Sequence, residues 1–304
     1  MNELKSTLTA LGTSLMRAIH TRLDPEPLIN DPWGDQLVAE DAREVFRKRA
    51  IERLGASYVA GPNEHSDAIL DLSIPRNAAY PEVIVRTRFT EDALHRAVIS
   101  GVTQYVIIGA GFDSFVLRRP EFARSVVVYE IDQSRTQASK LKRFAECGLT
   151  PMDPVHFVAA NFNEENLPTA LARAPFKSGD KTFFSWLGVT MYLSREVNLS
   201  ALRSIVSCAP PGSELVFTYF DEKAIFSDAV SEPFRSLRNW VSRIGEPWLS
   251  GFDPGNLADD LHQVGLDLIE DLDGNQMLER YGRDGSYGWS LDGLFHIAHA
   301  RIAG

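Results

Sequence analysis

The chain has 304 residues and a formal net charge of −10, and 44% of its residues are hydrophobic and 24% charged, as in an ordinary globular protein. The acidic balance argues against nonspecific binding to nucleic acid or to an anionic membrane surface, so we expect neither partner. The two cysteines, Cys147 and Cys208, have no metal-binding or redox spacing, and no apolar run approaches the roughly 18 residues of a membrane span or forms a signal-peptide core, so we expect a cytoplasmic protein.

The first 80 residues are predicted to form a helical extension. Apolar residues recur there every three or four positions, at Leu4, Leu8, Leu11, Leu15 and Ile19. This spacing predicts one apolar face on a helix, which the prolines at 25 and 27 end. A second helical tract opens at residues 31–33 and continues through 41–53. The extension either packs as an addition to the core or covers a ligand site as a lid, and the sequence leaves both open.

A long helix is predicted over residues 81–100, with Pro81 in its first turn. Arg86 falls on the face that carries Val83 and Leu94. An arginine at such a position either reaches solvent or pairs with a neighbouring acid. The alternative is that its guanidinium binds a carboxylate on a ligand in bidentate fashion.

Two short strands follow, and the residues after each are suited to a nucleoside. The runs at 105–108 and 126–129 are β-branched or aromatic and bounded by turn residues, as in parallel strands buried on both faces. The first strand leads into a glycine turn and the second into two acids: Gly109-Ala-Gly111-Phe-Asp113 and Glu130-Ile-Asp132. Glycine lets backbone approach a ligand, and the acid accepts hydrogen bonds from ribose hydroxyls.

The glycine turn differs from that of a dinucleotide site. Ser114 stands where the dinucleotide pattern requires a third glycine. The segment 115–120 is short and ends in Pro120, so it cannot form the long helix whose N-terminus binds a pyrophosphate. These features favour a ligand with one nucleoside and no pyrophosphate, and they disfavour a nicotinamide-dependent dehydrogenase.

The rest of the chain alternates between strands and helices. Strands are predicted at 155–159, 182–187, 214–220 and 266–272, and helices at 134–147, 167–174, 194–208, 231–244 and 254–264. The last segment, 295–302, alternates between apolar and polar residues, which predicts a half-exposed edge strand. No internal repeat or interdomain linker is found.

These motifs, in this order, resemble the leucine carboxyl methyltransferase family, whose bacterial members are S-adenosylmethionine-dependent O-methyltransferases. The resemblance covers roughly residues 80–220 and is carried by Arg86-Thr-Arg88, Gly109–Ser114, Glu130–Asp132 and Gly188-Val-Thr-Met-Tyr-Leu193. It implies an α/β, Rossmann-like class I methyltransferase fold, with a mostly parallel seven-stranded sheet and an antiparallel last strand. Residues 1–80 would be the helical extension or lid, and 81–304 the methyltransferase domain, with a substrate-covering insert at about 221–254.

The resemblance also implies a binding site for S-adenosyl-L-methionine. Its residues would be Arg86, Gly109, Gly111, Asp113, Glu130, Asp132, Asn161, Phe162 and Leu187. In the family's pattern Arg86 would bind the methionine carboxylate and Asp132 the ribose hydroxyls, with Glu130 as a supporting acid. Asn161 and Phe162 would contact the adenine. No metal is implied.

Two positions depart from the family's pattern. An acid usually stands where this chain has Asn161, but an amide oxygen can still accept a hydrogen bond from adenine. In the family's pattern a glutamate faces the cofactor at the position of Leu187, and leucine cannot accept a hydrogen bond. Either another acid or a water molecule accepts this hydrogen bond, or the binding of the cofactor is weakened by about 1.5–3 kcal/mol. This departure motivates the alternative function of a degenerate nucleoside-binding module without turnover.

The expected acceptor is a carboxyl or hydroxyl oxygen on a small molecule, such as a natural-product-like acid or phenol, or on a peptide terminus. Tyr192, which follows the fourth strand, either orients the acceptor or packs against the helix that follows it. Trp240, Trp248 and Phe252 in the insert either line an acceptor pocket or belong to the core. The sequence leaves open whether the protein is a monomer or a homodimer.

Overall fold

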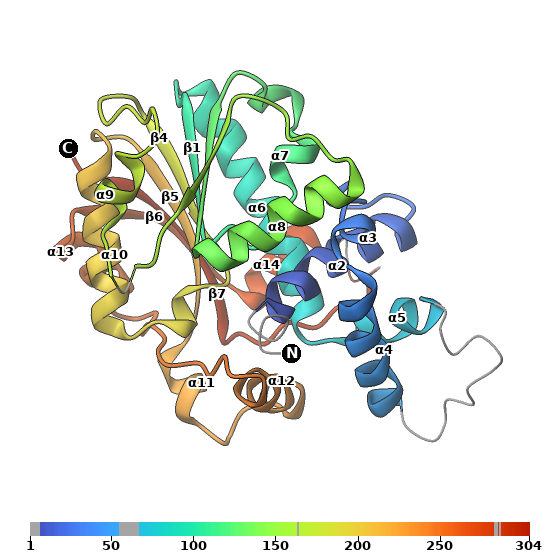
Figure 1. Cartoon of the computed structure of the whole chain (residues 1–304). Helices are drawn as coiled ribbons and strands as arrows, with labels where there is room; N and C mark the ends of the chain where they lie inside the picture. Colours follow the sequence, from blue (N-terminus) through green and yellow to red (C-terminus); the bar gives the residue numbers. More distant parts are fainter. Residues whose placement is uncertain (1–6, 55–66, 163, 283–284, 286) are drawn as a thin grey trace.

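The computed structural model describes residues 7–54, 67–162, 164–282, 285 and 287–304. A seven-stranded sheet in the order β3-β2-β1-β4-β5-β7-β6 forms its centre (Figure 1). The strands are β1 Gln104–Ile108, β2 Val127–Asp132, β3 Val155–Ala159, β4 Thr182–Trp186, β5 Glu214–Phe220, β6 Leu266–Asp273 and β7 Phe295–Ile302. Strands β1 to β5 are parallel, and β7 is antiparallel to both of its neighbours. The predicted mostly parallel sheet with an antiparallel last strand is confirmed.

Helices cover both faces of the sheet. In Figure 1, α9 Leu167–Leu171, α10 Arg195–Cys208 and α13 Leu257–Gln263 lie on one face, and α6 Ala79–Ile99, α7 Phe115–Arg118 and α8 Ser134–Cys147 lie on the other. Successive residues of β1 alternate between two apolar cores: Tyr105 and Ile107 pack in one, and Val106 and Ile108 in the other. Burial on both faces explains why this strand is continuously apolar.

The prediction that 295–302 forms an edge strand is wrong. β7 lies between β5 and β6, seven of its eight residues are buried, and β6 is the edge. Its polar residues are buried beside acids: His299 Nε2 lies 2.8 Å from Glu214 Oε2, and His296 Nδ1 lies 3.2 Å from Asp271 Oδ2. The alternation therefore reflects paired histidines rather than exposure to solvent.

The segment before α6 forms short helices, namely α2 Leu8–Leu23, α3 Gly34–Leu37, α4 Glu40–Leu54 and α5 Ala68–Ser73. The predicted apolar face of α2 is buried, although Leu4 lies outside the described residues. The helical tract predicted from 31 to 53 is interrupted at Val38, whose carbonyl accepts a hydrogen bond from Arg43 Nε at 3.0 Å. Among the helices of the described ranges, we find none with the length and apolar character needed to cross a membrane.

The remaining elements follow β5 and β6 or are short 3-10 turns. They are α11 Glu222–Phe226, α12 Glu232–Arg243, α14 Gly274–Tyr281, η2 Ile74–Arg76, η3 Glu121–Ala123 and η4 Thr190–Tyr192. In Figure 1, α11, α12 and α4 lie at the same end of the molecule, below the sheet. This is the end at which the parallel strands finish.

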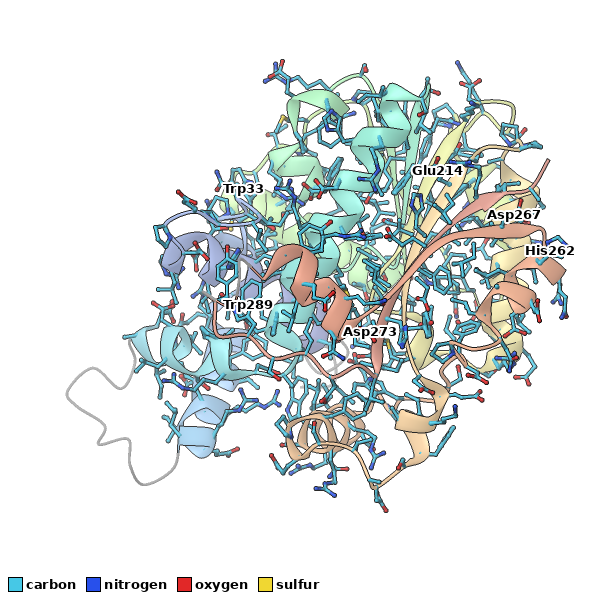
Figure 2. All side chains as sticks on the ribbon, turned by 180° about the vertical axis from the view of Figure 1, so that it is seen from behind. Trp33, Glu214, His262, Asp267, Asp273 and Trp289 are labelled. Carbon is cyan, nitrogen blue, oxygen red and sulfur yellow. The ribbon has the colours of Figure 1, made fainter. Side chains whose placement is uncertain are left out.

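The C-terminal segment before β7 packs against the N-terminal helices. Figure 2 shows Trp289 beside these helices, away from the edge strand marked by Asp267. Trp289 stacks on Tyr287 with ring centroids 4.1 Å apart, and its ring lies 5.6 Å from that of His20 on α2. The N-terminal helices therefore pack against a segment from the C-terminal part of the chain.

Candidate active site

A cavity of about 670 Å³ opens where β1, β2, β3 and β4 end. The carboxyl edge of a parallel sheet is where α/β folds bind ligands, and this volume is typical of a small-molecule site. All but one of the residues predicted for the site line the cavity: Arg86, Gly109, Gly111, Asp113, Asp132, Asn161, Phe162, Leu187 and Tyr192. The exception is Glu130.

The glycine turn after β1 has a backbone that only glycine adopts easily. Gly109 has a φ of +69°, and a Cβ there would lie 2.4 Å from Val189 Cγ2. Gly111 has a φ of +48°, and its Cβ would lie 2.9 Å from the Cβ of Ala10 on α2. The turn is therefore closely packed against neighbours that leave no room for a side chain. Asp113 Oδ1 accepts a hydrogen bond from Phe115 N at 2.6 Å and so fixes the start of α7.

Ser114 joins the glycine turn to the N-terminal helices. Its hydroxyl hydrogen-bonds the buried carboxylate of Asp31. Asp31 Oδ2 also lies 2.7 Å from Arg17 Nε on α2, and Arg17 Nη2 donates to the carbonyl of Phe112 at 3.0 Å. The residue that replaces the third glycine of a dinucleotide site thus holds the extension against the turn.

Asp132, at the end of β2, has its carboxylate at the cavity wall. Oδ2 accepts a hydrogen bond from Gly111 N at 2.5 Å, and Oδ1 accepts one from Gln133 N at 2.7 Å. Burial raises the pKa of Asp132, although these two backbone bonds lower it. A carboxylate offers about four acceptor positions, so both oxygens can still accept hydrogen bonds from ligand hydroxyls.

Glu130 faces away from the cavity. Its Oε2 lies 2.6 Å from Lys140 Nζ on α8, and Gln137 Nε2 donates to its backbone carbonyl at 3.2 Å. Burial raises the pKa of Glu130 to about 7 against the attraction of Lys140. The side chain therefore ties α8 to the strand that carries Asp132.

Arg86 lies against the turn after β4 and pairs with an acid on its own helix. A Cβ on Gly188, which has a φ of +68°, would lie 2.8 Å from Arg86 Nη2. Arg86 Nη1 lies 2.5 Å from Glu82 Oε1, one helical turn earlier. Burial raises the pKa of Glu82, and Arg86 opposes that shift. The arginine thus has an acidic partner and also faces the cavity. Glu82 and Arg86 together present one negative and one positive group beside Leu187.

Asn161 and Phe162 follow β3 at the other end of the cavity. Asn161 Nδ2 donates to Glu164 Oε1 at 2.8 Å. Phe162 packs against the apolar core on the α10 face of the sheet. The two residues offer a polar and an apolar group side by side in the chain.

The wall opposite the sheet comes from α2, α4 and the insert after β5. Trp240 and Trp248 line the cavity, whereas Phe252 is fully buried against Phe217 and Tyr219 and belongs to the core. Glu246 also lines the cavity, and its Oε2 accepts a hydrogen bond from Thr9 Oγ1 at 2.7 Å. The insert therefore supplies both apolar and acidic groups.

The pKa values of Tyr192 and Glu246 are both raised. Burial raises the pKa of Tyr192 and, next in weight, so does the charge of Glu246. Burial raises the pKa of Glu246 as well, against the hydrogen bond from Thr9. Glu82 and Glu246 are not among the site residues predicted from the sequence. Glu82 could have been found from its spacing of four residues before Arg86, but Glu246 offers no such signal.

Within the described ranges, no group of three or more histidine, cysteine or acidic side chains could hold a metal ion.

Known proteins resemble this chain across most of its length. A family model described as leucine carboxyl methyltransferase matches residues 10–206. YktD of Bacillus subtilis is 30% identical over 302 residues, which is 99% of this chain and 99% of YktD. The Mycobacterium tuberculosis protein Rv1729c is 32% identical over 234 residues, 76% of this chain and 70% of that protein. Both carry the provisional name of S-adenosyl-L-methionine-dependent methyltransferases.

Solved structures share the fold. A duf574 family protein from Streptomyces avermitilis has a TM-score of 0.55 at 16% identity, covering 88% of this chain and 98% of that one. A Thermobifida fusca protein, provisionally described as a methyltransferase, has a TM-score of 0.53 at 15% identity, covering 75% and 84%. The predicted class I methyltransferase fold is confirmed. The chain belongs to the leucine carboxyl methyltransferase family and is an S-adenosyl-L-methionine-dependent methyltransferase.

Proposed function

We propose that this enzyme transfers a methyl group to a carboxyl or hydroxyl oxygen of a small-molecule or peptide-terminal acceptor. One observation carries the proposal: a single cavity joins the predicted nucleoside residues Asp132 and Asn161 to a second wall that holds Tyr192 and Glu246. Donor and acceptor can therefore meet in one cavity. Holding two reactants in line can contribute roughly 7–11 kcal/mol to catalysis.

The proposed cofactor residues follow the cavity from one end to the other. Asn161 and Phe162 hold the adenine, and Asp132 accepts from the ribose hydroxyls. Arg86 binds the methionine carboxylate, and Glu82, its ion-pair partner, takes the ammonium group in place of the acid that Leu187 does not provide. The bound cofactor supplies a methyl group already activated by its positively charged sulfur.

The N-terminal helices are proposed to act as a lid over this site. Two contacts support that role: Ala10 on α2 lies against Gly111, and Thr9 bonds Glu246 of the insert. The lid and the insert then close on each other and exclude water from the reacting groups. Residues 81–304, with the insert at about 221–254, form the methyltransferase domain.

Tyr192 and Glu246 have different proposed roles at the acceptor. Because burial raises its pKa, Tyr192 stays protonated and orients the acceptor oxygen by donating a hydrogen bond. Glu246 accepts the proton from a hydroxyl acceptor, and its raised pKa suits a general base. A carboxylate acceptor needs no base.

A radiolabel assay tests the proposal. The enzyme is incubated with S-adenosyl-L-methionine tritiated in the methyl group and a panel of aromatic, aliphatic and peptide carboxylic acids, phenols and alcohols. A methyl ester releases volatile methanol in mild base, whereas a methyl ether does not. We expect turnover of at least one oxygen acceptor. Cofactor binding without any turnover would instead support the degenerate binding module that Leu187 suggests.

A further inference from the structure

Two arginines of α4, the half-buried Arg49 and the exposed Arg53, line the cavity without an ion-pair partner among the described residues. Several other arginines in the first half of the chain do have a carboxylate within 4 Å: Arg17 pairs with Asp31, Arg43 and Arg47 pair with Asp67, Arg86 with Glu82, and Arg118 with Glu91. Guanidinium groups that line a cavity without a counter-ion are available to bind an anionic group of a ligand.

The surroundings of the two side chains hold them toward the cavity. The guanidinium of Arg49 lies over the ring of Trp240, with Cζ 3.7 Å from the ring centroid. Arg53 Nη1 donates to the backbone carbonyl of Ser73 at 3.3 Å. Trp240 and Ser73 both line the same cavity. The stacking on Trp240 fixes the plane of the Arg49 fork while its N–H groups stay available.

The two cations also repel each other. Burial, followed by the charges of Arg53 and Arg243, lowers the pKa of Arg49 to about 10. The pKa of Arg53 is lowered as well, by partial desolvation at the cavity wall, although part of its side chain is exposed to solvent. A bound anion would relieve the repulsion between the two cations and the partial loss of hydration of Arg49.

We propose that Arg49 and Arg53 bind a carboxylate on the methyl acceptor, whose apolar or aromatic body lies against Trp240 and Trp248. The planar fork of arginine matches a carboxylate with two parallel hydrogen bonds, and the indole rings provide the apolar surface. The acceptor is therefore an aromatic or apolar acid. This inference rests on the proposed function, because it identifies the acceptor of that reaction.

Matched pairs of ligands test it directly. Isothermal titration compares 1-naphthoate, biphenyl-4-carboxylate and 3-phenylpropanoate with their primary amides, both with and without saturating S-adenosylhomocysteine. We expect at least one acid to bind about tenfold or more tightly than its amide. The double variant Arg49→Gln/Arg53→Gln should bring acid and amide to within about twofold. A cooperative melting transition shows that the double variant is folded, since it loses the stacking on Trp240 and the bond to Ser73 along with the repulsion between the cations.

Lys48→Gln is the control for loss of positive charge on α4, since it removes one charge from an exposed side chain that pairs with Glu44 and does not line the cavity. It should keep the preference for the acid. The proposal is overturned if no acid binds more tightly than its amide, if the preference survives in the double variant, or if Lys48→Gln abolishes it equally. Failure of S-adenosylhomocysteine to bind would count against the proposed function instead, and the titrations without it would still decide the role of the arginines.

Discussion

Replacing Gly188 by alanine should weaken cofactor binding through Arg86. The new Cβ would lie 2.8, 2.9 and 3.1 Å from Nη2, Nη1 and Cζ of Arg86, so the guanidinium must move from its position beside Glu82. The φ of +68° adds a backbone cost of about 1–2 kcal/mol to folding. Displacing one charged hydrogen bond costs about 1.5–3 kcal/mol, or roughly 10- to 150-fold in the affinity for S-adenosylhomocysteine.

Gly212→Ala separates the two effects. Gly212 has a φ of +83°, and its Cβ would lie 3.6 Å from Lys181 Cε, in the turn before β5 and outside the cavity lining. Both variants should lose stability in calorimetric melting, whereas only Gly188→Ala should lose affinity in isothermal titration. Wild-type affinity in Gly188→Ala, or an equal loss in Gly212→Ala, would refute the assignment of Arg86 to the methionine carboxylate.

Three further predictions concern ionisable groups. The affinity for S-adenosylhomocysteine should rise with pH from about 4.5 as Glu82 ionises, because its folded pKa is raised, and Glu82→Gln should flatten the profile measured by titration calorimetry. The raised pKa of Glu130 means that the folded state retains its proton, so the free energy of unfolding should fall as pH rises from about 4.5 to about 7. Urea unfolding at pH 5 and 7.5 should show a smaller difference for Glu130→Gln, and an unchanged difference would contradict this. Burial raises the pKa of Cys208 to about 12, so iodoacetamide at pH 8 should label Cys147 alone in the native protein, as read by mass spectrometry.

The sequence is sufficient to place the strands and to predict that most of the candidate residues lie around one cavity, because parallel strands end at one edge of a sheet. The residues after β1, β2, β3 and β4 are therefore brought together by topology, whatever their separation in the chain. The sequence shows that Ser114 does not fit a dinucleotide site. It does not show the role of the side chain, whose hydroxyl hydrogen-bonds Asp31 of the N-terminal extension.

The parts that could not be predicted depend on packing between distant segments. Glu246 and Arg49 line the cavity because the insert and α4 pack over the end of the sheet. No local sequence pattern predicts this packing. His296 and His299 suggested exposure until the structure placed acids beside them. The helix α14 was missed although Asp273 and Gln276 form a capping box at its start, a signal that the sequence contains.

The central claim is that this cavity binds the methyl-donor cofactor through the acid at the end of β2. Isothermal titration of S-adenosylhomocysteine into the wild-type chain and into Asp132→Ala tests it most directly. We predict one saturable site per chain with a dissociation constant below about 1 mM, and binding at least about tenfold weaker in Asp132→Ala. Absence of saturable binding below the millimolar range, or equal affinity in the two proteins, would contradict the account.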